Sequence, residues 1–160
     1  MADSQRPFVG RTPRPAPNFR SMWWRAGDAL AGVFARIGIG PIHLLTTPDR
    51  TSGRLHRNPV VLVEQDGKRF LVAPYGVVGW VRNARAAGRV SLRRGRELRA
   101  YAVRELAAAE AGPVLKRYLA LAARTGAYFT ADKDSPVAEF AAEADLHPVF
   151  ELAPLEKEAV

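Results

Sequence analysis

The Asp66–Gly67 pair lies between two runs of β-forming residues, and this pattern constrains the fold more than any other in the chain. The run before it, Asn58–Glu64, contains four consecutive apolar residues, and the run after it is Arg69–Ala73. An Asp-Gly pair in such a place favours a two-residue type I′ turn, because both turn positions need a positive φ. The pattern therefore predicts a β-hairpin whose first strand is well buried.

Further strand-forming runs precede and follow this hairpin, and the connections between them are short. A second hairpin is predicted across Gly95–Arg96, where a glycine again separates two β-forming runs. The order of elements shows no βαβ alternation, so a parallel sheet is not expected. The pattern predicts a mainly β domain with flanking helices, in which six strands form a small antiparallel barrel. The other predicted strands are Ile42–Thr46, Val90–Arg94, Glu97–Arg104 and His147–Leu152.

Three helical segments are predicted among these strands. A short helix covers Trp80–Ala87 and is followed by a glycine. Ala107–Arg124 also has helical character, but Pro113 has no backbone N–H to donate. We therefore expect the helix to restart there, with Pro113 in a first turn. A third helix begins next to Pro136 and ends near Asp145.

Before the first strand the chain changes character twice. The first segment is rich in proline and arginine, which predicts an extended or disordered arm. The second predicts a helix with an apolar stripe that can pack on the domain. Trp23 and Trp24 lie beside basic residues in it, so contact with a membrane surface is the alternative for this helix. The predicted organisation is a tail at 1–20, a helix at 21–40, a barrel at 41–153 and a C-terminal tail at 154–160.

Length and residue usage exclude several classes of protein. The chain has 160 residues, which suits one domain with a substantial core. It has no cysteine, and this excludes disulfides, thiolate metal sites and cysteine nucleophiles. Neither a signal peptide nor an apolar run of membrane-spanning length is found, so a cytoplasmic location is expected. His43, His56 and His147 lack the spacing of a metal site and are expected to be surface or strand residues.

The formal net charge of +8 invites a search for an anionic partner. Nucleic acid and an anionic membrane surface are the first candidates for such a charge. The arginines do not alternate with aromatic residues in a strip, as binding of single-stranded nucleic acid would require. We therefore expect no nucleic-acid partner. A phosphorylated small molecule would use a few arginines and leave the others in solvent.

A segment suited to an anion lies between the first two predicted strands. It combines three arginines, two hydroxyl residues and a glycine. Guanidinium groups bind phosphate in fork geometry, hydroxyls donate hydrogen bonds, and glycine lets backbone N–H groups approach an anion closely. A basic turn exposed to water is the alternative. The residues are Arg50, Thr51, Ser52, Gly53, Arg54 and Arg57.

A second segment, Val72–Asn83, leads from a strand through an apolar loop with two glycines into the helix that begins near Trp80. Such a loop can place backbone amides and flat side chains against an aromatic ring system. Packing of Trp80 in the core is the alternative.

Together the two segments resemble the deazaflavin-dependent nitroreductase family of actinobacteria. That family has Leu-Leu-Thr-Thr, a Gly-Arg-x-Thr-Gly segment, Asn-Pro, Val-Ala and Trp-Tyr-x-Asn-Leu, in this order. The resemblance covers roughly residues 40 to 152. The corresponding segments here are Leu44–Thr47, Arg50–Gly53, Asn58–Pro59, Val72–Ala73 and Trp80–Asn83.

The resemblance implies a six-stranded antiparallel split β-barrel and an F420-dependent reductase. The deazaflavin coenzyme F420 would pass a hydride to a small electrophilic acceptor, such as a quinone, a nitro-aromatic or an activated alkene, without a side-chain nucleophile. Its phosphate and acidic tail are expected at the basic segment, and its ring along the second segment. Tyr75 and Tyr128 are expected on the substrate side, where either could donate a proton. Besides the basic segment, the implied cofactor-binding residues are Asn58, Pro74, Tyr75, Gly76, Trp80, Val81, Arg82 and Asn83.

At two positions the chain differs from the family pattern. Thr51 replaces a lysine that many members have, and His56 replaces an arginine before the second strand. These differences leave the acceptor open. A split barrel that holds FMN or haem is the second hypothesis, and a basic module for nucleic acid or a membrane is the third. Self-association into a homodimer is also left open.

Overall fold

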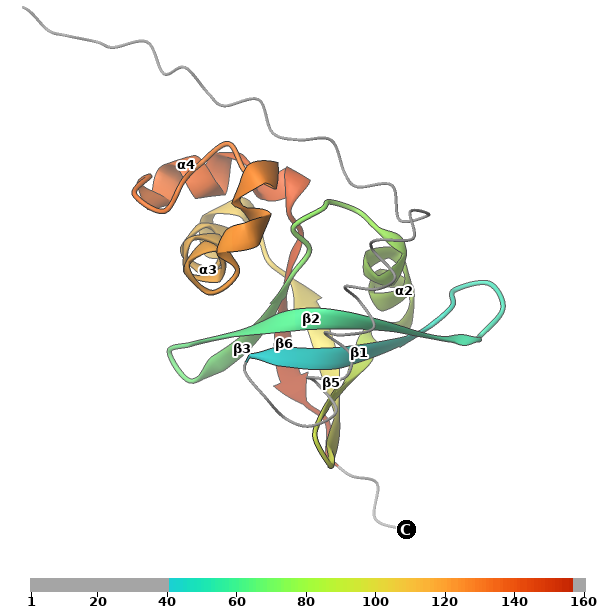
Figure 1. Cartoon of the computed structure of the whole chain (residues 1–160). Coiled ribbons are helices and arrows are strands. Elements are labelled where there is room, and N and C mark those ends of the chain that lie inside the picture. The colour runs from blue at the N-terminus through green and yellow to red at the C-terminus, as the bar shows by residue number, and fades with distance from the viewer. Residues whose placement is uncertain (1–40, 157–160) are drawn as a thin grey trace, which may run out of the picture.

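The computed structural model describes residues 41–156 of the chain, and β-strands dominate them. Within this range six antiparallel strands form a closed barrel in the order β1-β2-β3-β6-β5-β4 (Figure 1). The predicted antiparallel barrel is confirmed. The strands are β1 Ile42–Pro48, β2 Leu55–Gln65, β3 Lys68–Val72, β4 Arg89–Arg94, β5 Glu97–Glu105 and β6 Val149–Pro154.

The predicted Asp-Gly hairpin joins β2 to β3. Asp66 has a φ of 53° and Gly67 a φ of 72°, the pair of left-handed residues that a type I′ turn needs. Gln65 lies opposite Lys68 in the register, so the turn contains only these two residues. The second predicted hairpin joins β4 to β5 through a turn that includes Gly95. Both hairpins follow from local sequence alone.

β2 is longer than the predicted run Asn58–Glu64, because it begins at Leu55 and ends at Gln65, and it includes Pro59. A proline cannot donate to a sheet ladder, so it is tolerated only where one side of a strand has no partner. β2 pairs with β1 from Leu55 onward, but β3 joins it only from Leu62. Pro59 lies before that point and therefore leaves the β2–β3 ladder intact.

Helices cover the barrel in two separate places. α2 (Gly79–Ala87) lies alone, next to the β1–β2 end of the barrel (Figure 1). The other helices gather on another side, and the loop from β3 to α2 runs between the two groups (Figure 1). That loop is continuous with α2 and contacts the larger group where the ring of Tyr75 lies against that of Tyr128. The members of the larger group are α3 Ala108–Leu121, the 3-10 helix η1 Ala123–Tyr128, α4 Val137–Ala142 and the 3-10 helix η2 Ala144–Leu146.

The apolar core has two parts, separated by the sheet. One part fills the barrel and includes Leu45 and Val81. The other lies between the barrel and the larger helical group, and Leu115 belongs to it. On β2 the neighbours Leu62 and Val63 belong to different parts, because successive strand residues point to opposite faces. This alternation decides which side chains near the site face inward.

Two details correct the sequence predictions. Pro113 is the sixth residue of an uninterrupted α3, and it does not begin a restarted segment. Pro113 is exposed, so the bend that a proline causes falls on the solvent side of the helix. The last strand begins at Val149, and His147 is buried just before it. The predicted tail at 1–20 and the helix at 21–40 lie outside the described residues.

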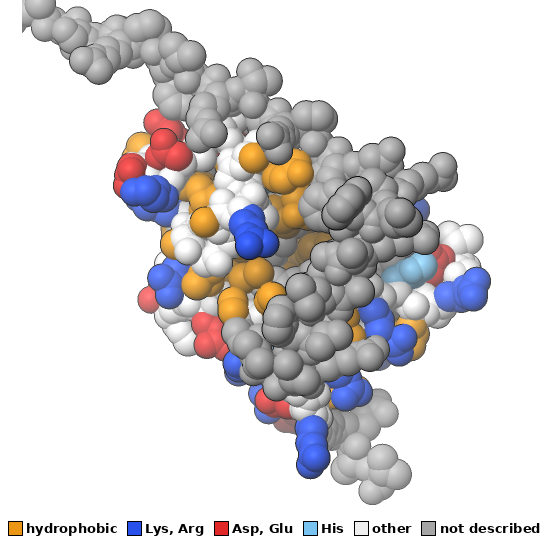
Figure 2. Space-filling view, in the orientation of Figure 1, with side chains coloured by type: hydrophobic (Ala, Val, Ile, Leu, Met, Phe, Trp, Pro, Cys, Tyr) orange, Lys and Arg blue, Asp and Glu red, His pale blue; other side chains and the backbone are white. Residues whose placement is uncertain are grey.

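Basic side chains are spread over the described surface, and some of them are paired with acids. Figure 2 shows Lys and Arg in separate groups on the face that it displays, several of them beside acidic side chains. Arg85 forms a bidentate ion pair with Glu105, in which Nε lies 2.9 Å from Oε2. Arg104 binds both Glu110 and Glu151. Part of the positive charge on the described surface is therefore compensated locally.

Candidate functional site

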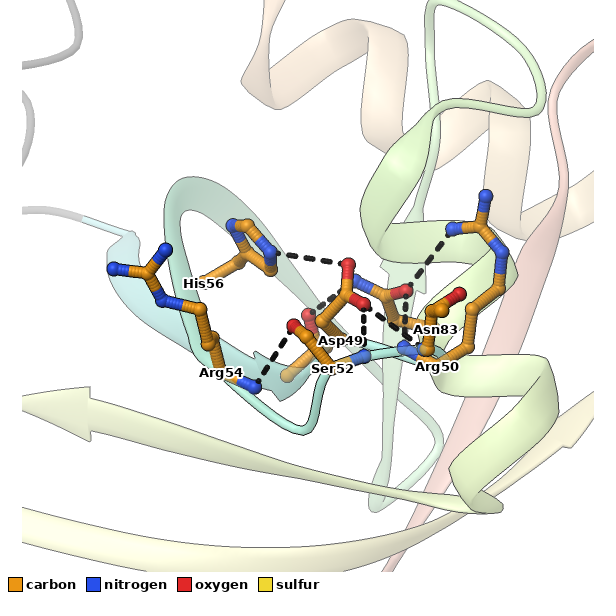
Figure 3. Close-up of polar contacts among 8 residues, drawn as sticks. Asp49, Arg50, Ser52, Arg54, His56 and Asn83 are labelled. Atoms are coloured by element: carbon orange, nitrogen blue, oxygen red, sulfur yellow. Dashed lines mark hydrogen bonds and ion pairs between the residues drawn. The ribbon is translucent and has the colours of Figure 1, made fainter.

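The segment between β1 and β2 is folded around the carboxylate of Asp49, and we call residues 49–54 the Asp49 turn. Oδ1 of Asp49 accepts hydrogen bonds from the backbone N–H groups of Thr51 (2.9 Å) and Ser52 (2.8 Å). Oδ2 lies 3.2 Å from Nε2 of His56 (Figure 3). The N–H donors of Ser52 and Thr51 are the main reason why the pKa of Asp49 is lowered to about 2. The turn is thus held together by hydrogen bonds to a carboxylate of its own.

These bonds change the role that the sequence predicted for the turn. The backbone N–H groups of Thr51 and Ser52 already donate to the Asp49 carboxylate, and that of Gly53 donates to the Asp49 carbonyl at 2.9 Å. The N–H of Arg54 donates to Oγ of Ser52 at 3.3 Å. A bound phosphate would have to compete with Asp49 for the same donors. The turn therefore offers guanidinium groups to an anion, rather than the backbone cradle that we predicted.

Asn83 on α2 holds Arg50 beside the helix. Its Oδ1 accepts hydrogen bonds from both the backbone N and Nη1 of Arg50, each at 3.2 Å (Figure 3). Its Nδ2 lies 3.5 Å from Oγ1 of Thr47 on β1. Asn83 is only 3% exposed, so its amide is a structural link between helix, turn and strand. The sequence placed Asn83 in the site, and the structure shows how it positions Arg50.

The three arginines of the basic segment point in different directions. In Figure 3, Arg50 and Arg54 extend to opposite sides of the turn. Asn58 pairs with Leu45, whose side chain lies in the barrel core, so Asn58 is on the inner face of β2. Its neighbour Arg57 is therefore on the outer face. The predicted set of Arg50, Arg54 and Arg57 does not form one cluster, and of these arginines Arg50 is the one bonded to α2.

The N-terminus of α2 adds positive charge next to Arg50. Val78 precedes the helix and provides no side-chain cap, and the first turn has no acidic residue. The first N–H groups of a helix carry a partial positive charge that attracts anions. Arg82 is exposed in this first turn, one residue before the Asn83 amide that binds Arg50. This donor set fits the anionic end of a phosphorylated cofactor.

Trp80 and Val81 lie in the barrel core and not on the surface. Trp80 is 8% exposed, and its ring centroid lies 5.9 Å from that of Phe150. Val81 is fully buried. The core alternative for Trp80 is therefore correct, and its side chain forms no platform for a cofactor ring. Both residues anchor α2, which in turn positions Arg82 and Asn83.

The structure brings together two tyrosines that are far apart in sequence. Tyr75 lies in the β3–α2 loop and Tyr128 at the end of η1, and their ring centroids are 4.8 Å apart in an edge-to-face arrangement. Both are partly exposed, as are Pro74 and Gly76 on either side of Tyr75. Gly76 has a φ of 89°, a conformation that residues with a side chain rarely adopt. The result is an apolar surface with phenol groups, suited to a flat ring.

Next to this loop the structure reveals a buried pair that sequence analysis missed. Nε2 of His147 lies 3.0 Å from Oε1 of Glu143, and the two residues are 3% and 7% exposed. The expectation that His147 is a surface or strand residue is wrong. The spacing of four residues in a helical stretch was the available signal, because it places two side chains on one face.

Comparison with known families identifies the chemistry. The profile of the F420H2-dependent quinone reductase family matches residues 19–137. This range includes strands β1 to β5, α2 and both tyrosines of the site. A search of curated proteins gives no significant match.

Several solved structures are similar to this chain. One, described as a domain-swapped dimer, has 25% identity and a TM-score of 0.51, and the match covers 82% of this chain and 97% of that one. An F420-H2 dependent reductase, FDR-A, has 28% identity, a TM-score of 0.45 and coverages of 71% and 94%. A putative pyridoxamine 5'-phosphate oxidase from Listeria innocua has 11% identity, a TM-score of 0.50 and coverages of 78% and 91%. The last similarity concerns the fold alone.

The family match decides among the cofactors that the barrel left open. FMN and haem were the alternatives, and the match selects the deazaflavin. The cationic start of α2, with Arg50 and Arg82, agrees with an acidic cofactor. The resemblance to deazaflavin-dependent reductases is confirmed, whereas nitroreductase activity remains a prediction. The chain belongs to the F420H2-dependent quinone reductase family, and it is an F420-dependent oxidoreductase whose cofactor is coenzyme F420.

Proposed function

We propose that this enzyme reduces a small electrophilic acceptor, with a quinone as the preferred class and nitro-aromatics or activated alkenes as weaker ones. Reduced F420 supplies a hydride and a proton, so that a quinone becomes a hydroquinone while the coenzyme returns to its oxidised form. The observation that carries the proposal is the Tyr75–Tyr128 pair in a chain of this family. The protein contributes orientation, exclusion of water and charge.

The anionic end of the cofactor is assigned to the start of α2. Arg82 and Arg50 supply guanidinium groups, and the helix start supplies the backbone N–H groups of Gly79 and Trp80, because those of Val81 and Arg82 donate to the Val78 carbonyl. Arg54 is exposed on the other side of the Asp49 turn and would reach only a more distant acidic group. Asn83 keeps Arg50 in place without contacting the ligand itself.

The ring and the acceptor are assigned to the β3–α2 loop. Pro74, Tyr75 and Gly76 are partly exposed there, and the Tyr128 ring lies against Tyr75. The two rings form an apolar wall for a flat acceptor, and a phenol O–H can donate a hydrogen bond to a quinone oxygen. Such a bond is stronger when that oxygen gains negative charge, so it favours reduction.

Anaerobic mixing with reduced F420 tests the proposed reaction. Quinones, nitro-aromatics and activated alkenes are added in turn, and reoxidation of the coenzyme is followed by its absorbance. Faster reoxidation with quinones than with the other two classes supports the proposal. Tight binding of the coenzyme with no reoxidation by any quinone would rule out this choice of acceptor.

The Arg50→Ala variant tests the cofactor assignment. Loss of a hydrogen bond to a charged group should weaken F420 binding by about 10- to 100-fold. The matched control is Arg96→Ala, in the β4–β5 turn at the opposite end of β1, which should bind as tightly as the unmodified protein. Unchanged affinity together with a large fall in melting temperature would show that Arg50 is only structural.

Two further proposals concern partners. A homodimer is supported by the solved relative that is a domain-swapped dimer, and light scattering of the full chain tests it. Peripheral membrane contact rests on Trp23 and Trp24, which lie outside the described residues. Within residues 41–156 no helix has the length and apolar character needed to cross a membrane. Loss of vesicle binding on deletion of residues 1–37 would support that contact, and we retain a cytoplasmic location as the expectation.

A further inference from the structure

The Glu143–His147 pair has every polar atom of its side chains bonded. Nδ1 of His147 lies 2.8 Å from the carbonyl oxygen of Pro74, and Nε2 lies 3.0 Å from Oε1 of Glu143. Oε2 of Glu143 accepts hydrogen bonds from the N–H groups of Ala131 (2.9 Å) and Thr130 (3.1 Å). The pair therefore joins three segments of chain that are remote in sequence.

The chemistry of these partners fixes where protons lie. A carbonyl oxygen can only accept, so Nδ1 of His147 must carry the hydrogen that it donates to Pro74. Nε2 then faces a carboxyl oxygen, and a second hydrogen must lie between Nε2 and Oε1, on one atom or the other. With these hydrogens in place both side chains are fully hydrogen-bonded. At 3% and 7% exposure neither side chain is open to an acceptor.

The partners of the pair lie immediately beside the two tyrosines. Pro74, whose carbonyl binds His147, is the residue before Tyr75. Thr130, whose N–H binds Glu143, is two residues after Tyr128. Between them the His147 ring stacks on Phe129, with centroids 3.9 Å apart and an angle of 19° between the planes. The pair thus holds the backbone on the Tyr75 side and on the Tyr128 side at once.

The chain around His147 holds the same loop at two further points. The carbonyl of Pro148 accepts a hydrogen bond from the N–H of Ala73 at 2.9 Å. The carbonyl of Leu146 lies 3.4 Å from where a Cβ on Gly76 would be. The loop that carries Tyr75 is therefore in contact with residues 146–148 before, at and after Pro74.

We propose that Glu143 and His147 are positioning residues of the acceptor site, and that they set the geometry of the Tyr75–Tyr128 pair. This inference rests on the proposed role of that pair. The inference extends that proposed role by naming the residues that keep the two tyrosine rings of the acceptor wall in place. Neither residue reacts, because both are buried and fully bonded. Their effect reaches the acceptor only through the backbone of residues 74 and 130.

The first test compares His147→Phe with Glu143→Gln. Phenylalanine can still stack on Phe129 but leaves the Pro74 carbonyl without its donor. Glutamine can accept from Thr130 and Ala131 through its oxygen and donate to Nε2 through its NH2 group. We expect His147→Phe to raise the quinone KM about tenfold, with F420 affinity unchanged, and Glu143→Gln to behave as the unmodified protein. A fall in melting temperature without a change in KM would overturn the proposal.

A second test removes the tyrosines through which the pair should act. In a Tyr75→Ala, Tyr128→Ala background, His147→Phe should have little further effect on KM, because residues that act through one another are not additive. If the tenfold effect persists in that background, His147 acts elsewhere and the proposal is wrong.

A third test does not depend on turnover. The chain has four tyrosines, and Tyr101 in the barrel core serves as an internal reference. With ring-labelled tyrosine, His147→Phe should shift the NMR signals of Tyr75 and Tyr128 and leave that of Tyr101 in place. Should His147→Phe fail to fold, His147→Asn retains an amide donor toward Pro74 and takes its place, with smaller shifts expected. Unmoved Tyr75 and Tyr128 signals would refute the positioning role, whereas shifted signals in an enzyme that reduces no quinone would refute only the proposed acceptor.

Discussion

Two carboxylates in this molecule have almost the same set of partners and opposite surroundings. Asp49 accepts hydrogen bonds from two successive backbone N–H groups and lies 3.2 Å from a histidine Nε2. Glu143 likewise accepts from two successive N–H groups and lies 3.0 Å from a histidine Nε2. The side chains of Asp49 and His56 are 24% and 53% exposed, whereas Glu143 and His147 are nearly inaccessible.

The comparison shows that burial and sequence separation decide what the same set of carboxylate hydrogen bonds does for the fold. All partners of Asp49 lie within seven residues of it, so its bonds shape a local turn. Water can replace any of them at little cost. The N–H partners of Glu143 are 12 and 13 residues away, and the carboxylate that they bind is only 7% exposed. Its bonds therefore connect separate parts of the fold, and breaking them should cost far more.

The largest expected effect follows removal of the buried carboxylate. Glu143→Ala leaves the N–H groups of Thr130 and Ala131 and Nε2 of His147 without a partner. We expect a loss of about 3–5 kcal/mol in the free energy of unfolding, measured by urea denaturation. Asp49→Ala is the matched change at the exposed site and should cost much less. Equal losses for the two variants would contradict the comparison.

Asn83 is the buried contact of the otherwise exposed Asp49 turn, so its removal should have an intermediate effect. Asn83→Ala frees Arg50 and leaves Oγ1 of Thr47, which is fully buried, without its partner. We expect a loss of about 1–3 kcal/mol in unfolding free energy, together with weaker F420 binding in calorimetry. Arg50→Ala separates the two effects, because it should weaken binding without the loss of stability.

Substitution of Gly76 tests the backbone of the loop that the buried Glu143–His147 pair holds. Gly76→Ala forces a residue with a Cβ to a φ of 89°, close to the carbonyl of Leu146. This should cost about 1–2 kcal/mol of stability by chemical denaturation. Since Gly76 is next to Tyr75, the quinone KM should rise as well. Gly53→Ala, at a φ of 73° with open space around it, is the control and should leave KM unchanged.

The smallest effect is expected from titration of Asp49. Its pKa is lowered from 3.8 to about 2, so its bonds contribute stability above pH 3.8 and lose it as the pH falls through about 2. The carboxyl carbon signal of Asp49 in an NMR titration should therefore have its midpoint near 2. A midpoint near 3.8 would mean that the N–H bonds of the turn do not persist in solution.

Local sequence was sufficient for the hairpins, for α2 and for the approximate positions of the strands along the chain. Asp66–Gly67 determines its turn because the φ values that it needs belong to those two residues alone. Five short motifs between Leu44 and Asn83, taken together and in order, were enough to indicate the family. For Trp80 the sequence left a cofactor platform and core packing open, and it cannot decide between them. Whether a tryptophan at a helix start faces a ligand or a barrel depends on the side from which the helix packs.

Sequence by itself determined which residues form strands and which turns join them, because each depends on residues close together in the chain, and its motifs in order indicated the deazaflavin-dependent reductases. Tertiary structure alone decided that Tyr75 meets Tyr128, that Asn83 binds Arg50 and that His147 reaches Pro74. These contacts span 33 to 73 residues. They depend on which face of each strand and helix points inward in the closed barrel, so no local pattern contains them.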